Sequence, residues 1–201
     1  ESCALMTDAG TPAISDPGED LVRLCAENGV EVRAIPGCCA AVNALAVSGL
    51  PTGRFTFEGF LTVNKKSRRE HLNSLKSETR TMIFHEAPHK LRTTLNDLTE
   101  AFGPDRRISL CRELTKLHEE VLRFTLAEAV SYYEENAPKG EYVLVVAGAA
   151  PKTGAVVTLE DGVAQVLALK EQGMRLKDAA KEVAEHTGLS KNELYAAALE
   201  R

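Results

Sequence analysis

The sequence lacks tryptophan altogether, and aromatic residues make up only 5% of its 201 positions. It has no apolar run of the roughly 18 residues that a membrane-spanning helix needs, so no membrane association is predicted. It also lacks any Cys-x-x-Cys pair, and its five cysteines are an odd number. This usage predicts reduced, mostly buried thiols in a cytoplasmic protein rather than a disulfide framework.

The chain also lacks an excess of positive charge, because its formal net charge is −5. That balance argues against a protein that binds nucleic acid over its whole surface, but it leaves room for a local basic patch. The apolar fraction of 44% is enough for a real core, and the length predicts one or two domains. No internal repeat or low-complexity segment is present.

The most informative segment is the loop at residues 7–18, which is rich in Gly, Pro, Ser and Thr. It follows an apolar run at residues 3–6, predicted as a buried strand, and precedes apolar residues at helical spacing from Leu21. Loops after strands carry ligands in α/β folds, so Asp8 is a candidate ligand contact. Asp16 is predicted as the N-cap of the following helix, with Pro17 at its first position.

Beyond this loop the pattern predicts an α/β protein with three parts. These are residues 1–53, residues 54–150, and a linker with helices over residues 151–201. Strands are predicted at 30–35, 55–60, 80–85, 107–112, 121–125 and 141–147, and helices at 38–48, 66–77, 89–102, 127–135, 160–172, 176–187 and 191–200. The link between 112 and 121 is too short for a helical crossover, so these later strands are expected to include antiparallel pairs. The last two helices have helix-turn-helix form.

Residues 85–89 match the zinc-protease pattern His-Glu-x-x-His. That pattern needs one helix to carry both histidines, and here Pro88 interrupts it. We therefore expect a strand that ends at His85 or Glu86, a helix that begins near Pro88, and no metal site. The segment remains a candidate ligand contact.

Two charged segments have two interpretations each. The run at residues 65–69 is either a solvated helix face or a phosphate contact. Lys90 with Arg92, and separately Arg112 with Lys116, would extend this basic patch only if the fold brings them together. The segment 112–116 has three ionisable groups in five residues, which either pair with one another or face a substrate.

Several motifs together resemble the tetrapyrrole-methylase superfamily. They are Thr-Asp-Ala-Gly-Thr-Pro with Ile-Ser-Asp-Pro-Gly at 7–18, Ile-Pro-Gly-Cys-Cys-Ala-Ala at 35–41 and Ser-Gly-Leu-Pro at 48–51. Segments 57–61, 66–69, 84–90, 112–116 and 139–141 are similar to its branch of cytidine ribose 2′-O-methyltransferases of small-subunit ribosomal RNA. The tail resembles the helix-turn-helix-like domain of that branch.

The resemblance implies a two-domain enzyme, usually a homodimer, that holds S-adenosylmethionine between its domains and needs no metal. Cofactor contacts carry over onto Asp8, Thr11, Cys39, Ala40, Glu86 and Leu114. RNA contacts carry over onto Lys66, Arg68 and Arg69. A ribose hydroxyl is a poor nucleophile, so a proton acceptor is expected, and Glu86, Glu113 and His89 are the candidates.

One departure from the family is the missing glycine-rich strand and loop that would precede residue 1. The first domain is therefore expected to be incomplete, with weak cofactor binding and poor methylation. Two alternative functions stay open. One is methylation of a corrin or porphyrin, and the other is a non-catalytic nucleic-acid-binding module built on the C-terminal helices.

Overall fold

The computed structural model describes residues 2–150 and 158–199. The chain divides into two compact units, Glu1–Ala149 and Ala150–Arg201, which are described separately. Most of the linker predicted at 151–158 lies outside the described residues.

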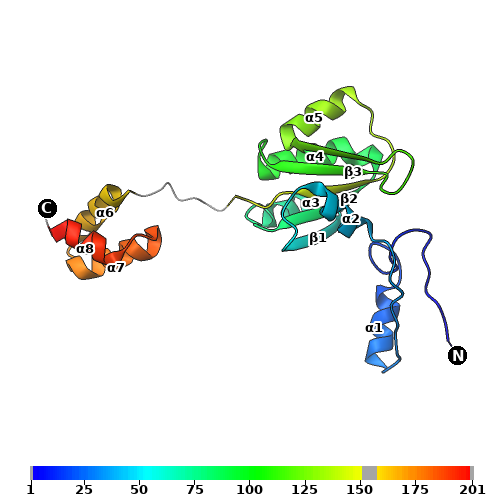
Figure 1. Cartoon of the computed structure of the whole chain (residues 1–201), viewed down its shortest axis with the longest axis horizontal. Helices are drawn as coiled ribbons and strands as arrows, with labels where there is room; N and C mark the ends of the chain where they lie inside the picture. The colour runs from blue at the N-terminus through cyan, green and yellow to red at the C-terminus, as the bar shows by residue number, and fades with distance from the viewer. Residues whose placement is uncertain (1, 151–157, 200–201) are drawn as a thin grey trace. The chain divides into compact units, whose positions relative to one another are not determined.

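The first unit is built on one five-stranded sheet (Figure 1). Its strands are β1 (Phe55–Phe60), β2 (Thr81–Glu86), β3 (Arg107–Arg112), β4 (Glu120–Thr125) and β5 (Tyr142–Val146), in the spatial order β1-β2-β5-β3-β4. Strands β1 and β2 are parallel, whereas β5 is antiparallel to both β2 and β3, and β4 is antiparallel to β3. The predicted antiparallel pairing after residue 107 is confirmed.

Helices cover both faces of this sheet (Figure 1). The helices α3 (Lys65–Ser74), α4 (Pro88–Phe102) and α5 (Leu126–Glu135) share one hydrophobic core with side chains such as Met82 and Phe84 of β2. Ile83 points to the opposite face, where α2 (Ala40–Ser48) packs. This alternation follows from the two-residue period of a strand and makes the sheet the central layer of three.

Helix α2 packs against the sheet with Leu45 and three small buried side chains, those of Ala41, Ala44 and Ser48. It ends at Gly49, whose φ of 77° gives the left-handed conformation that favours glycine. The guanidinium of Arg123, on β4, donates to the backbone carbonyls of Val47 and Ser48 and so satisfies the C-terminal end of the helix.

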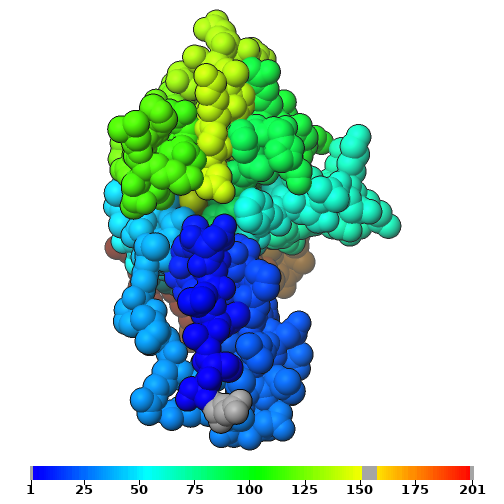
Figure 2. All heavy atoms as spheres, turned by 90° about the vertical axis from the view of Figure 1, so that its right-hand side faces the viewer, coloured from blue at the N-terminus to red at the C-terminus, as the bar shows by residue number. Residues whose placement is uncertain are grey.

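The predicted strands at residues 3–6 and 30–35 are wrong. Neither segment pairs with a strand among the described residues, and their apolar side chains are exposed, with Met6 at 84% and Ile35 at 87%. A strand is held by hydrogen bonds to a neighbour, and an apolar run alone does not supply one. Figure 2 shows the N-terminal region, in blue, extending below the green part of the first unit.

Helix α1 (Glu19–Glu27) also corrects the sequence analysis. Its N-cap is Gly18, at φ 133°, and not Asp16, and it buries no side chain. Its C-cap is Asn28, followed by Gly29 at φ 67°, as predicted.

The second unit is a three-helix domain of α6 (Leu159–Glu171), α7 (Leu176–Thr187) and α8 (Lys191–Leu199). Its core includes Val166, Ala180 and Leu194. Gly188, at φ 75°, makes the sharp turn between α7 and α8, which gives the predicted helix-turn-helix arrangement. Over residues 2–150 and 158–199, no helix combines the length and apolar character needed to cross a bilayer.

Candidate active site

The topology gathers most of the predicted site segments at one end of the sheet. Glu86, the last residue of β2, lies opposite Tyr142 at the start of β5, and Tyr142 lies opposite Arg112 at the end of β3. The segments that follow β2 and β3, and the segment that precedes β5, therefore meet at this end. None of these segments is close to the others in the sequence, so the sheet alone brings them together.

Three of the predicted cofactor contacts converge on the α2 face at this end. Cys39, the N-cap of α2, and Leu114 pack against the same hydrophobic cluster. The hydroxyl of Thr11 donates to the backbone carbonyl of Cys38 at 2.9 Å and ties the 7–18 loop to the start of α2. Ala40 follows as the first, exposed residue of α2, whereas Asp8 is exposed and accepts only a local bond from Thr7.

The loop at residues 112–116 is held by its own charges. The Oε1 atom of Glu113 accepts from the backbone N–H of Glu141 at 2.9 Å and from Lys116 Nζ at 3.1 Å, and Lys116 Nζ also contacts Glu141 Oε2 at 2.9 Å. The first of these bonds, with the help of the second, lowers the pKa of Glu113. Arg112 pairs with Glu120 across the β3–β4 ladder at 3.2 Å. Mutual pairing is thus what the structure contains here, and it leaves Glu113 a weak proton acceptor.

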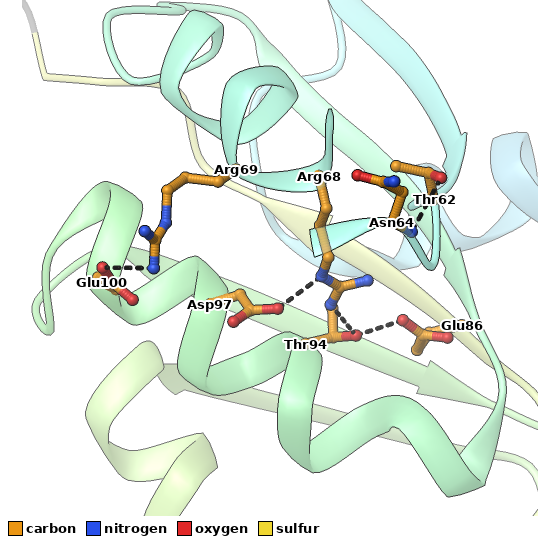
Figure 3. Close-up of polar contacts among 8 residues, drawn as sticks. All are labelled: Thr62, Asn64, Arg68, Arg69, Glu86, Thr94, Asp97 and Glu100. Carbon is orange, nitrogen blue, oxygen red and sulfur yellow. Dashed lines mark hydrogen bonds and ion pairs between the residues drawn. The ribbon is translucent and has the colours of Figure 1, made fainter. Parts of the chain in front are cut away.

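Glu86 lies on the opposite face of the sheet from Cys39 and Leu114. Its side chain is 4% exposed; Oε2 accepts from the Thr94 hydroxyl and Oε1 from the backbone N–H of Ala87 at 2.9 Å. The carboxylate therefore faces α4 and Thr94 (Figure 3). Contacts within the protein engage both of its oxygens.

Arg68 is the member of the basic run that the structure places inside. Its side chain is 10% exposed; Nε donates to Asp97 at 2.5 Å and Nη2 to the Thr94 hydroxyl at 2.7 Å (Figure 3). An arginine held in this way does not present its guanidinium to RNA, which corrects the expectation for this residue. Leu72 is buried one helical turn later, and the i, i+4 spacing of the two residues on one face is the signal that could have revealed it.

The rest of the basic run lines an open groove between α3 and α4. The groove has a volume of about 950 Å³, and the cationic or imidazole side chains on its walls include Lys65, Lys66, Arg69, His89 and Lys90. Two of these cations have acidic neighbours at the outer limit of an ion pair. Lys66 lies 4.0 Å from Glu70, Arg69 lies 3.7 Å from Glu100, and all four side chains are largely exposed. Such exposed pairs are weak, so these cations remain available to an anion.

His85 and His89 belong to different elements, a strand and a helix, as the rejection of the zinc motif required. His85 packs edge-to-face against Phe57 and Phe60, at centroid distances of 5.2 and 5.4 Å, and burial lowers the pKa of its imidazole. A bulge at Gly59 brings both phenylalanines to the same face of β1. Within residues 2–150 and 158–199, no cluster of three or more His, Cys, Asp or Glu has metal-site geometry.

Comparison with known families agrees with this architecture. The family described as Tetrapyrrole (Corrin/Porphyrin) Methylases matches residues 1–130. The chain belongs to the tetrapyrrole methylase family. A second match, to the RsmI C-terminal HTH domain, covers residues 157–201 and so includes the three-helix unit.

Within the tetrapyrrole methylase family, the chain is similar to proteins named ribosomal RNA small subunit methyltransferase I. The protein from Synechocystis sp. is 45% identical over 200 residues, which are 100% of this chain and 72% of the relative. The protein from Escherichia coli O157:H7 is 42% identical over 203 residues, covering 100% of this chain and 70% of the relative. The Mycobacterium tuberculosis H37Rv protein is 44% identical over 197 residues, which cover 98% of this chain and 67% of the relative.

Two solved structures of tetrapyrrole methylases share the fold. The methyltransferase CobJ gives a TM-score of 0.53 at 23% identity, covering 72% of this chain and 64% of that one. The cobalt precorrin-4 methyltransferase CbiF gives a TM-score of 0.51 at 15% identity, covering 69% of this chain and 61% of that one. The chain thus spans just under two thirds of the length of these structures, and the likeness concerns the fold alone.

Sequence reasoning missed Thr94, Asp97 and Arg123, which hold the site elements in place. A threonine in the middle of a helix and an aspartate one turn after it carry no motif. Only the positions of the neighbouring helix and strand give them a role.

Proposed function

We propose that the chain is an S-adenosylmethionine-dependent methyltransferase of small-subunit ribosomal RNA, and that its acceptor is the ribose 2′-hydroxyl of a cytidine. The observation that carries this proposal is the similarity of 42–46% over nearly the whole chain to proteins named for that RNA. The basic groove beside the sheet end supports it, since a row of cations suits the phosphates of an RNA backbone.

The residues at the start of α2 fit the methyl donor. Cys39 is extended and forms no side-chain cap, so the first backbone N–H groups of the helix are free to hold a carboxylate such as that of a methionine group. The exposed Ala40 leaves space for close approach, and Leu114 with Cys39 offers an apolar wall. When bound, S-adenosylmethionine supplies a methyl group on a sulfonium, which a nucleophile attacks in line.

The groove between α3 and α4 would hold the RNA backbone. Lys66, Arg69 and Lys90 are the cations placed to contact phosphates, and each contact would release counterions and make binding depend on salt. Arg112 and Lys116 are already paired with carboxylates, and Arg68 is buried, so we assign these three residues a structural role.

Among the three candidate proton acceptors, His89 is the one whose side chain is exposed in this groove. Glu86 has both oxygens engaged, and Glu113 accepts two hydrogen bonds that disfavour its protonation. We therefore assign to His89 the role of accepting the proton of the ribose hydroxyl. Because His89 follows the end of β2 on the α4 face and the donor is placed on the α2 face, the acceptor ribose is proposed to lie across this end of the sheet.

The cofactor assignment is tested by Ala40→Glu, with Ala46→Glu as the matched control on the same helix. Both positions are exposed. The new carboxylate at position 40 suits the helix dipole but occupies and repels the place of a ligand carboxylate. Isothermal titration with S-adenosylhomocysteine should show at least tenfold weaker binding for Ala40→Glu and little change for Ala46→Glu. Equal affinities would contradict the placement of the donor.

The alternative of a non-catalytic nucleic-acid-binding module is tested by removing residues 152–201. The proposal expects RNA affinity to fall while labelled methyl transfer to small-subunit RNA stays detectable. If transfer is absent in both forms while RNA binding follows the tail, the module interpretation is correct. A homodimer is also proposed, and light scattering after size exclusion should give twice the chain mass of 21.8 kDa.

A further inference from the structure

A network of buried polar side chains connects the basic helix α3 to the last residue of β2. It runs from Asp97 through Arg68 and Thr94 to Glu86 and involves three elements of the fold (Figure 3). Thr94 is fully buried, and Arg68 and Glu86 are nearly so. Arg68 and Asp97 form part of the groove wall, but their polar atoms are engaged within the protein, so the proposed phosphate contacts give this network no task.

The direction of each hydrogen bond in this network is fixed by which groups can donate and which can accept. A guanidinium only donates, so Arg68 donates to the hydroxyl oxygen of Thr94. The single hydroxyl proton of Thr94 is then available to Glu86 Oε2, which accepts it. Loss of the Thr94 hydroxyl would therefore leave a buried donor of Arg68 and a buried acceptor of Glu86 unpaired.

At its Glu86 end, this network sets the position of the turn between β2 and α4. Glu86 also accepts from the backbone N–H of Ala87, the N-cap residue of α4, and so fixes the turn between β2 and α4. His89 and Lys90 stand on the first turn of that helix. The orientation of this first turn therefore depends on the contacts of Arg68 at the other end.

We propose that Arg68 and Thr94 are positioning residues which couple α3, the helix that meets RNA, to the β2–α4 turn that carries His89. The inference rests on the proposed function for its substrate. It differs from a direct phosphate contact, because the guanidinium of Arg68 acts inside the protein on Thr94 and Asp97. Binding of RNA to the outer side of α3 would then affect the position of the β2–α4 turn through a rigid set of buried hydrogen bonds.

The binding arm of the test separates positioning from contact. Fluorescence anisotropy with a single-stranded small-subunit RNA fragment is measured against salt for wild type, Lys66→Ala and Arg68→Met. Loss of one phosphate contact lowers the slope of log K against log salt by about 0.7. We expect that change for Lys66→Ala and none for Arg68→Met. A slope for Arg68→Met equal to that of Lys66→Ala would overturn the proposal.

The kinetic arm uses Thr94→Val, which keeps the shape and removes the hydroxyl, with Thr94→Ser as the rescue. Thr99→Val is the matched control, since the Thr99 hydroxyl bonds only to the Leu95 carbonyl of its own helix. We expect kcat for methyl transfer to fall at least about tenfold in Thr94→Val, because small misplacements of reacting groups are costly. The KM for RNA should stay within twofold, and Thr94→Ser should restore most of kcat. A rise in KM with unchanged kcat would overturn the proposal.

Amide hydrogen exchange at Ala87 provides a readout that needs no activity. Thr94→Val should speed exchange of the Ala87 N–H at least tenfold, because its acceptor Glu86 is no longer held, and Thr99→Val should not. Equal exchange in the two variants would overturn the proposal. Failure of the wild type to methylate RNA would instead contradict the proposed function, and exchange at Ala87 would still decide whether the network positions the turn.

Discussion

The attachment of α2 to β4 through Arg123 gives a prediction whose size follows from the structure. Arg123→Met keeps the aliphatic stem but removes the guanidinium that donates to Ser48, with Nε 3.0 Å from its carbonyl oxygen, and to Val47. Ser48 is 2% exposed, so its carbonyl would lose its side-chain donor in a buried position, at a cost of about 1–2 kcal/mol. The Val47 bond is exposed and adds only a few tenths, and loss of a cation at a helix C-terminus adds about 0.3–1 kcal/mol.

The expected loss is therefore about 2 kcal/mol in the free energy of unfolding of the first unit, or a fall in Tm of about 4–8 °C. Three of the four tyrosines report on this unit, because only Tyr195 lies in the second, so urea unfolding followed by tyrosine fluorescence measures it. Arg107→Met on neighbouring β3 is the control, since Arg107 is exposed. If the two variants lose equal stability, the reasoning that Arg123 holds the end of α2 is refuted.

Two further predictions concern the loop at residues 112–116 and the segment that follows β5. Hydrogen bonds lower the pKa of the Glu113 carboxyl below its ordinary 4.5. The stabilisation that the Glu113 carboxylate gives to the loop is therefore complete above pH 4.5 and is lost as the pH falls through the lower pKa of the folded state. The amide resonance of Glu141 should titrate with a midpoint below pH 4.5, and a midpoint at or above 4.5 would count against the pairing. A Cβ at Gly148 would lie 2.0 Å from the backbone oxygen of Thr79, so Gly148→Ala should cost about 3 kcal/mol or more. Thermal unfolding should show this loss, whereas Gly53→Ala, with open space around it, should leave Tm nearly unchanged.

The sequence predicted most of the fold between residues 40 and 147 because helices and strands there bury one face and show the matching period. Strand β1 has the predicted bounds, and the turn between β2 and α4 falls at Ala87, as the proline at position 88 required. The predictions at residues 3–6 and 30–35 failed for a physical reason. Pairing is a property of two segments, and an apolar run carries no information about whether its partner lies beside it.

The candidate site was less predictable than the fold. Cys39 and Leu114, which the motifs named as cofactor contacts, pack on one cluster, but the motifs gave no sign that Glu86 faces the other side of the sheet. A run of charges likewise says nothing about which member turns inward. Arg68 does so because it shares a helix face with Leu72, and the periodicity of α3 decides this rather than its composition.

The central claim is that this chain methylates small-subunit ribosomal RNA. The most direct measurement is transfer of tritium from labelled S-adenosylmethionine to small ribosomal subunits, with the protein in excess over RNA and the cofactor saturating. We expect label in the RNA that nuclease digestion recovers as 2′-O-methylcytidine, and loss of that label in His89→Ala. Label that appears only in a corrin or porphyrin offered in the same assay would contradict it.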